Sequence, residues 1–314
     1  MIATPICLFV YNRPKETENI LNSLSACRGS EQHPLFIFSD GAKNTQVVAE
    51  VAAVRKILHR PWPFLSIHYN ESCENRGLAK SIIEGVSQIL NQYEQVIVLE
   101  DDLVLAPDFL EYMEQSLQVY RNDHRIWSIS GYSPPIEIPE DYAQETYLIP
   151  RASSWGWATW KNRWEDIDWD IRDYPQFRKS PEKRRKFDEG GNDMSRLLDL
   201  QQQKRINSWA IRWCYAQFLK NMYTVYPVKS KVINQGFGSN ASHAGWHDTR
   251  HRVELNTSPL EVSSGLEPDS RIINAFKSHQ DLGIISKIGY FLRLHDLGYK
   301  FFQKILKSLL NHQH

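Results

Sequence analysis

The sequence predicts an α/β fold: a doubly wound mixed sheet with a helical extension at the C-terminal end. Three observations indicate it. Short apolar runs with the length of buried strands alternate with segments of helical periodicity through the first hundred-odd residues. Polar side chains follow these strands where they end, as at the ligand-binding edge of such a sheet. Shorter strand-like runs continue after residue 110.

In the first half of the chain, predicted strands and helices take turns. Unbroken apolar runs are typical of strands that are buried on both faces. The predicted strands are 5–11, 35–38, 64–69 and 96–99. Between them, apolar residues recur at helical spacing over 20–24, 47–58 and 78–90. This order predicts a parallel sheet.

The second half continues with a helix over 109–120, for which Asp108 is the expected N-cap. The remaining predicted elements are a strand at 126–130, a helix over 197–218, and short strands at 225–228 and 232–233. We expect a catalytic domain over 1–250, with a nucleotide-binding half at 1–110 and an acceptor half at 111–250. A connecting segment (251–283) and a tail (284–314) would follow.

The composition excludes some classes of protein. Among 314 residues, 37 are basic and 37 acidic, so no overall positive field attracts nucleic acid. The four cysteines are far apart and form no metal-type pair, which is typical of reduced thiols in a cytoplasmic protein. No segment approaches the about 20 apolar residues of a membrane span.

Three consecutive carboxylates, Glu100, Asp101 and Asp102, follow the apolar run Val96–Leu99. Charges at the end of a buried strand repel one another and are partly desolvated. A divalent cation would reverse that cost, because carboxylate oxygens suit Mg²⁺ and Mn²⁺. The alternative is a solvated acidic turn before the next helix.

Two other strands end in groups that suit the same ligand. Asn12-Arg13 follows the first strand and Asp40 the second, and the loop after the third strand leads to Asn75-Arg76-Gly77. Arginine can bind a diphosphate through paired hydrogen bonds, and Asp40 can accept hydrogen bonds from a base or ribose. The alternatives are a helix start, a tight turn and a glycine loop. No glycine-rich dinucleotide or P-loop motif is present.

The motifs Phe9-Val-Tyr-Asn-Arg-Pro14, Ser39-Asp-Gly41, Asn75-Arg-Gly-Leu-Ala79 and Val98-Leu-Glu-Asp-Asp102, in this order, resemble those of GT-A nucleotide-sugar glycosyltransferases of the family 2 type. The resemblance is to bacterial relatives of N-acetylglucosaminyltransferase I. It implies Mn²⁺ or Mg²⁺ on Asp102, and a donor site at the strand ends. The implied donor-binding residues are Tyr11, Asn12, Arg13, Asp40, Arg76, Gly77, Lys80, Glu100 and Asp101.

Tryptophans cluster between Trp155 and Trp213. Indole faces stack on sugar rings, so we assign Trp155, Gly156, Trp157 and Trp209 to the acceptor pocket. Core packing is the alternative for this cluster.

Residues 234–243 form a polar segment with two glycines and are predicted to be a loop. The resemblance extends to the end of this loop and implies that His243 lies near the metal or a phosphate. A surface imidazole is the alternative for His243.

The chain departs from the resembled family at the general base. Relatives carry an acid just after the tryptophan equivalent to Trp209, whereas Ala210 follows it here. The base is therefore unresolved, and the candidates are Glu165, Asp166, Asp168 and Asp193. Nearby, the basic stretch 178–186 and the glycine pair 190–191 suggest either a solvated insert or a mobile flap.

The tail from Ile284 to Leu310 combines apolar residues at helical spacing with five lysines or arginines and one acid, Asp296. This pattern is typical of a basic amphipathic helix on an anionic membrane surface. Packing on the catalytic domain or a partner subunit is the alternative. The protein is thus expected in the cytoplasm, or peripherally on the inner face of the cytoplasmic membrane.

These observations predict a metal-dependent glycosyltransferase. It would move a sugar from a nucleotide-diphosphate donor to a hydroxyl of a glycan or lipid-linked glycan, with inversion, in cell-surface polysaccharide synthesis. The alternatives are a sugar nucleotidyltransferase, and a catalytically silent protein that binds glycans or membranes.

Overall fold

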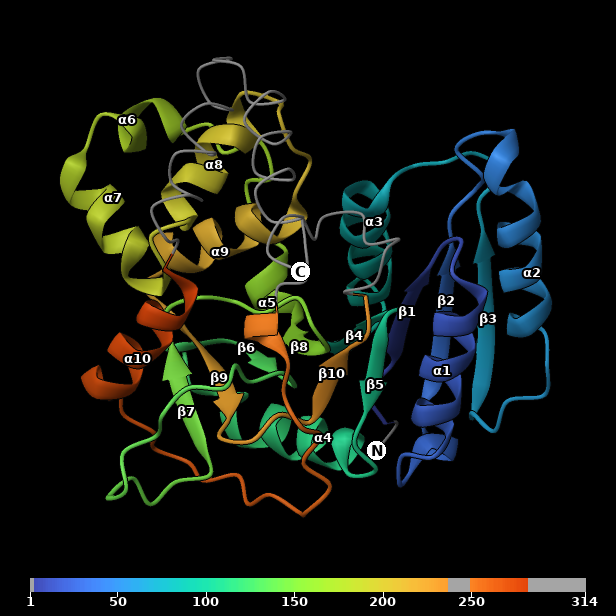
Figure 1. Ribbon diagram of the computed structural model, residues 1–314, viewed down its shortest axis with the longest axis horizontal. Helices are drawn as coiled ribbons and strands as arrows, with labels where there is room; N and C mark the ends of the chain where they lie inside the picture. Colours follow the sequence, from blue (N-terminus) through green and yellow to red (C-terminus); the bar gives the residue numbers. More distant parts are fainter. Residues whose placement is uncertain (1–2, 237–248, 282–314) are drawn as a thin grey trace, which may run out of the picture.

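The computed structural model describes residues 3–236 and 249–281 (Figure 1). Its main sheet has eight strands in the order β3-β2-β1-β4-β8-β6-β9-β7, and β10 pairs with β5 separately. The strands are β1 (Ile6–Val10), β2 (Pro34–Ser39), β3 (Ser66–Glu71), β4 (Gln95–Glu100), β5 (Leu103–Leu105), β6 (Ile126–Ser130), β7 (Thr146–Ile149), β8 (Trp157–Trp160), β9 (Tyr223–Pro227) and β10 (Val232–Asn234). The predicted α/β fold with a mixed sheet is confirmed.

Strand direction divides the sheet into two halves. Strands β3, β2, β1 and β4 are parallel, as predicted for the first half. Strand β8 runs antiparallel to both β4 and β6, so β4 and β6 point the same way. The carboxyl ends of β1, β2, β4 and β6 consequently lie along one edge of the sheet. We call it the ligand edge.

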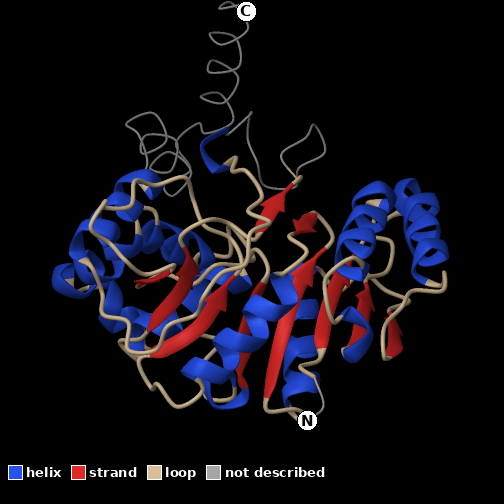
Figure 2. Cartoon of the chain, turned by 90° about the horizontal axis from the view of Figure 1, so that it is seen from below, coloured by secondary structure: helices blue, strands red, loops and turns tan. Residues whose placement is uncertain are grey.

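Helices cover both faces of the sheet (Figure 2). They are α1 (Pro14–Ser25), α2 (Val48–Leu58), α3 (Leu78–Leu90), α4 (Phe109–Tyr120), α5 (Lys161–Trp164), α6 (Tyr174–Arg178), α7 (Pro181–Phe187), α8 (Met194–Gln202), α9 (Trp209–Leu219) and α10 (Ser270–Gln280). The core under α1, α2 and α4 takes Leu8 of β1, whereas Phe9 points into the core under α3, α8 and α9. This alternation is the two-residue period of a strand.

The helix predicted over 197–218 is two helices, α8 and α9. Lys204 interrupts it with φ of +57°, a left-handed conformation that no helix continues through. Ser208 then caps α9 by accepting a hydrogen bond from the backbone N–H of Ile211.

Asp108 stands at the N-cap position of α4, but its side chain makes no cap hydrogen bond. It accepts instead from Nζ of the fully buried Lys231, at 2.5 Å. Carbonyl oxygens of Asn256 and Ser258 also accept from this ammonium. The residue that precedes β10 is thereby fixed to the start of α4.

Two glycines let β10 approach the main sheet. The backbone N–H of Gly131, after β6, donates to the carbonyl of Gly156, before β8, at 2.6 Å. A Cβ on Gly131 would lie 2.8 Å from a methyl of Val232, and one on Gly156 would lie 3.0 Å from it. Neither position has room for a larger residue without a shift of β10.

Trp157 and Trp209 were assigned to an acceptor pocket, and this assignment is wrong. Their side chains are 0% and 3% exposed and pack with Trp164 and Trp213 in the core under α9. Trp157 lies in β8, the strand between β4 and β6, and its side chain points to the face of the sheet that α3, α8 and α9 cover. These tryptophans fill the core.

The C-terminal part of the described chain returns to the sheet. Ile272 and Phe276 of α10 pack against Tyr147 and Tyr226. The predicted tail, 284–314, lies outside the described residues, and the domain boundaries stay predictions. Within the described ranges, no helix has the length and apolar character needed to cross a membrane.

The tryptophan core generates a stability prediction. Trp157→Ala should lower the free energy of unfolding by about 3–5 kcal/mol, because it leaves a cavity among three other indoles. Urea denaturation monitored by circular dichroism measures this loss. Leu219→Ala is the control, since Leu219 is 49% exposed, and should change stability by less than about 0.5 kcal/mol. A Trp157 variant as stable as the control would contradict the core assignment.

Candidate active site

The ligand edge brings the predicted carboxylates together with the ends of other strands. Glu100 is the last residue of β4, and Asp101 and Asp102 form the turn that leads into β5. Glu100 and Asp102 are half-buried, and Asp101 is buried. The buried strand before them leaves these charges little contact with water.

Residues at the end of β1 bond directly to this carboxylate triplet. Nη1 of Arg13 lies 3.0 Å from Oδ2 of Asp102 and 3.6 Å from Oδ1 of Asp101. The backbone N–H of Tyr11 donates to Oδ2 of Asp101 at 3.2 Å. The parallel pairing of β1 and β4 makes this possible, because it aligns Phe9 with Glu100.

Burial raises the pKa values of all three carboxyl groups, and repulsion by neighbouring carboxylates adds to it at Glu100 and Asp101. Burial, then the charges of Asp102 and Asp101, raise the pKa of Glu100 well above its usual range. Burial and Asp102 raise the pKa of Asp101 to about 7, against the opposing effect of Arg13. Burial also raises the pKa of Asp102, and Arg13 opposes it. The triplet holds more negative charge than its surroundings stabilise.

A segment far along the chain closes over Asp102. The N–H of Gln235, directly after β10, donates to the Asp102 carbonyl at 2.7 Å, and the side chain of Asn234, at the end of β10, acts to lower the pKa of Asp102. A Cβ on Gly236 would overlap Oδ2 of Asp102. The sequence predicts a glycine-rich loop after β10 and gives no indication of this contact. Its only local signal was the asparagine and glycine directly after an apolar pair.

Asp40 organises the loop before α3. Its carboxylate accepts four hydrogen bonds, from the backbone N–H groups of Gly41, Arg76 and Gly77 and from Nδ2 of Asn75, all between 2.8 and 3.0 Å. A carboxylate has about four acceptor positions, so the protein itself fills them. In this arrangement Asp40 holds the 75–77 loop and has no acceptor left for a base or ribose.

The other predicted donor-binding side chains surround this loop or the triplet. Arg76 and Lys80 are exposed enough to reach a ligand, and both lie near Glu84, at 3.4 and 3.7 Å. Gly77 has φ of +77° where the loop turns into α3, which favours glycine. Asn12 is half-buried between β1 and Arg13.

An aromatic cluster lies next to the two glycines that β10 approaches. Trp155 packs edge-on against Tyr132, at 4.4 Å between ring centroids, and against His251, at 5.7 Å. Trp155 is half-buried, and its neighbour Gly156 has φ of +61°. We call Tyr132, Trp155 and His251 the aromatic wall. Sequence reasoning selected Trp155 and missed the other two.

Strand β10 connects the aromatic wall to the triplet. Val232 packs against Gly131 and Gly156, which flank the wall, and Asn234 contacts Asp102. The two contacts lie two residues apart on one strand, so β10 is shared by the surroundings of the wall and of the triplet.

Glu165, Asp166 and Asp168 are not placed to act as the base, because they lie at the opposite edge of the sheet. Strand β8 runs away from the ligand edge, and the N–H of Lys161 donates to the carbonyl of Glu94, just before β4. Strand β4 separates the two edges by roughly 17 Å. Asp166 and Asp168 line a cavity there with residues that precede β6 and β9.

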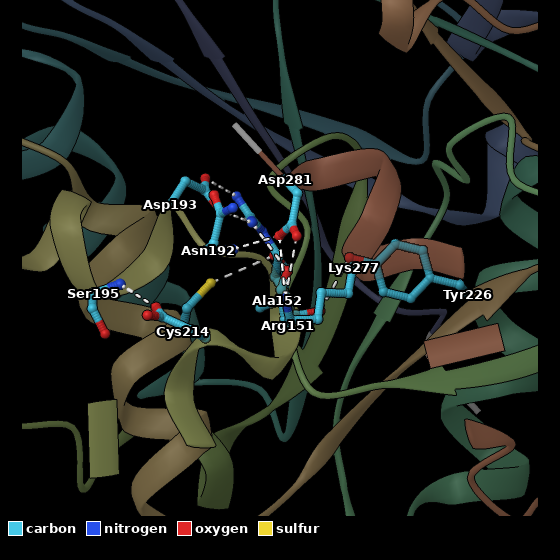
Figure 3. Close-up of polar contacts among 11 residues, drawn as sticks. Arg151, Ala152, Asn192, Asp193, Ser195, Cys214, Tyr226, Lys277 and Asp281 are labelled. Carbon is cyan, nitrogen blue, oxygen red and sulfur yellow. Dashed lines mark hydrogen bonds and ion pairs between the residues drawn. The ribbon is translucent and has the colours of Figure 1, made fainter. Parts of the chain in front are cut away.

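Asp193, the fourth candidate base, is occupied by an ion pair. Both of its oxygens accept from Arg151, at 2.7 and 2.9 Å, in a buried pairing (Figure 3). Arg151 also donates to the carbonyl of Gly190, and the N–H of Asn192 donates to Asp281. Asp193 thus ties the loop before α8 to the end of β7, which disfavours both the base and the flap hypothesis.

His243, the second predicted metal contact, lies outside the described residues. Among those described, no group of three or more histidine, cysteine, aspartate or glutamate side chains is arranged to hold a metal ion by itself. A metal at Asp102 would need further ligands from the donor and from water.

Comparisons with known proteins bear on the identity of this site. The model of the GNT-I family matches residues 1–186, which include the triplet, Arg13, Asp40 and Trp155. A curated relative, the alpha-1,3-mannosyl-glycoprotein 2-beta-N-acetylglucosaminyltransferase of Arabidopsis thaliana, is 21% identical over 147 residues, 44% of this chain. The matched part is 32% of that relative, so the chain spans about a third of its length.

Solved structures resemble the chain only distantly. Residues 1–349 of S. aureus TarS give a TM-score of 0.39 at 11% identity, over 75% of this chain and 61% of that one. The mannosyltransferase PcManGT from Pyrobaculum calidifontis, in complex with GDP-Man and Mn²⁺, gives 0.35 at 17% identity, over 50% and 44%. Scores at this level add no argument about the site. The family match covers more than half of the sequence and carries the motif order on which the resemblance was based, and the chain belongs to the GNT-I family.

Proposed function

We propose that this protein is a metal-dependent glycosyltransferase that moves a sugar from a nucleotide-diphosphate donor to a hydroxyl group of a glycan. The observation that carries the proposal is the charge at the end of β4. Among the described residues, Arg13 is the guanidinium that pairs with the triplet, so three ionised carboxylates would exceed its charge by two. Membership of the GNT-I family supports the reaction class.

The residues present fit a divalent metal. Asp102 keeps part of its carboxylate exposed, while Asp101 is tied to the N–H of Tyr11. The pKa values of Glu100 and Asp101 are raised first by burial and then by repulsion from neighbouring carboxylates, and Mn²⁺ or Mg²⁺ would favour the ionised forms. When bound, the metal would neutralise the departing diphosphate.

In this proposal, residues at the ends of different strands bind different parts of the donor. Asp102 holds the metal, Arg13 binds the diphosphate, and Glu100 and Asp101 face the nucleotide and the sugar. The 75–77 loop, held by Asp40, presents Arg76 to the donor, with Lys80 one turn into α3. Charge-assisted bonds from two arginines suit the two phosphates of a sugar donor.

The aromatic wall is the proposed acceptor side. Trp155 offers a half-buried indole to the apolar face of a sugar, beside a strand that contacts Asp102. Inversion at the sugar carbon belongs to the proposal, and its base is to be sought outside the four acids considered above. A lipid-linked acceptor, polysaccharide synthesis and contact of 284–310 with the inner face of the cytoplasmic membrane are further parts of it.

The reaction class is tested by the products of donor turnover. Incubation with a panel of nucleotide sugars and Mn²⁺ should release a nucleoside diphosphate, measured by chromatography. Addition of EDTA should stop the release, because the metal neutralises the leaving group. Release of pyrophosphate would identify a nucleotidyltransferase, and no release with any donor would favour a silent binding protein.

The metal ligand is tested by Asp102→Ala. This variant should lose metal-dependent donor binding, with a decrease in affinity of at least 100-fold, because the remaining carboxylates are buried or occupied (~2.7 kcal/mol). Isothermal titration calorimetry with and without Mn²⁺ measures it. Asp141→Ala is a matched control, since Asp141 is an exposed partner of Arg271. Unchanged Mn²⁺-dependent binding in the Asp102 variant would contradict the assignment of Asp102 as the metal ligand.

The role of Asp40 is tested by Asp40→Asn. An amide cannot accept all four hydrogen bonds, so the 75–77 loop should lose order and nucleotide affinity should fall roughly tenfold. Calorimetry with nucleoside diphosphates gives the affinity. Asp168→Asn is the control: Asp168 also accepts backbone N–H groups, from Asp170 and Arg172, but at the opposite edge. Equal affinities in the two variants would contradict the role of Asp40.

A further inference from the structure

Arg13 occupies the position between two carboxylates where a cation would bind. The same nitrogen, Nη1, approaches Asp102 and Asp101, at 3.0 and 3.6 Å. All three side chains are largely buried, between 11% and 20% exposed. The guanidinium is therefore the main counter-charge of the triplet in the donor-free protein.

The backbone of Arg13 is fixed at the start of α1, so any change of partner would be made by its side chain. Pro14 begins α1 directly after it, and the Arg13 carbonyl accepts from the N–H of Thr17 at 2.9 Å. An arginine can thus exchange partners within the reach of its own stem while α1 stays in place.

A guanidinium on Asp102 opposes a metal on Asp102. The two cations share the same carboxylate oxygens, and like charges at this separation repel each other strongly in a partly buried site. A diphosphate removes the conflict, because its oxygens can take the guanidinium in paired hydrogen bonds. Metal and diphosphate should consequently favour each other's binding, by the same factor in both directions.

We propose that Arg13 is an internal counter-cation that leaves Asp102 for the donor diphosphate when donor and metal bind together. The inference rests on the proposed function, since it assumes a metal at Asp102 and a diphosphate donor. It adds that the metal alone binds poorly, so the loaded site forms only with both ligands present. Arg13 then couples two binding events besides contacting the donor.

The test measures binding of Mn²⁺ alone, by electron paramagnetic resonance of the free ion. Arg13→Gln should bind Mn²⁺ about tenfold more tightly than the wild type, because the competing charge is gone. Its coupling to UDP or GDP, the ratio of Mn²⁺ affinities with and without the nucleotide, should fall towards one. Arg28→Gln removes an exposed arginine paired with Glu111 and should behave as the wild type.

Two further measurements keep the outcome clear. The melting temperature of Arg13→Gln should be lower than that of the wild type without metal and should rise more on addition of Mn²⁺, since the metal replaces the lost charge. Arg13→Lys keeps the charge on a side chain that cannot bridge both carboxylates, so Mn²⁺ alone should bind with intermediate affinity.

Binding of Mn²⁺ alone to Arg13→Gln that is equal to or weaker than in the wild type would overturn the inference. Weakened nucleotide binding with unchanged Mn²⁺ binding would have the same meaning, and would reduce Arg13 to a donor contact. The proposed function would survive either result, because it depends on product release and on Asp102→Ala.

Discussion

The negative charge at the end of β4 is the constraint on which the rest of the site depends. Strand β4 lies between β1 and β8 and is buried along its length, so the three acids after it cannot all turn to water. Three separate parts of the chain stabilise this charge. Tyr11 contributes a backbone N–H, Arg13 its guanidinium, and Asn234 its side chain. The site is assembled around a repulsion that the protein relieves only in part.

Because both halves of the sheet contribute residues to the site around this charge, the two halves must be held in a fixed relative position. The parallel half supplies the carboxylates, and the mixed half supplies the aromatic wall. Strand β10 belongs to neither sheet half, yet it carries Asn234 to Asp102 and packs on the glycines beside Trp155. Lys231, fully buried on Asp108, fixes the start of this strand. A small shift of β10 would therefore change both sides of the site together.

Periodicity was enough to predict the fold and the edge of the sheet where the polar strand ends meet, because strands, helices and the motifs after them are local features. The predictions of site residues failed where the position of a side chain depends on the direction of its strand or on the face of the sheet to which it points. Trp155 and Trp157 are two residues apart, but Gly156 turns the chain between them, so one reaches the wall and the other the core. Glu165 lies far from the site because β8 is antiparallel, and Asn234 reaches Asp102 through a contact 132 positions away in sequence. None of these arrangements of distant residues produces a recognisable pattern in the local sequence.

Asp40 shows how this protein would lower the entropic cost of recognition. Its carboxylate is consumed by the backbone of the loop before α3, so that loop is shaped before any ligand arrives. A ligand that meets a preformed loop loses little of its binding free energy to ordering the chain. Encounter with the nucleotide end should then be fast and nearly rigid. The slow step of loading would be the rearrangement of charge at the triplet, so nucleotides without a metal should dissociate quickly from a surface that already fits them.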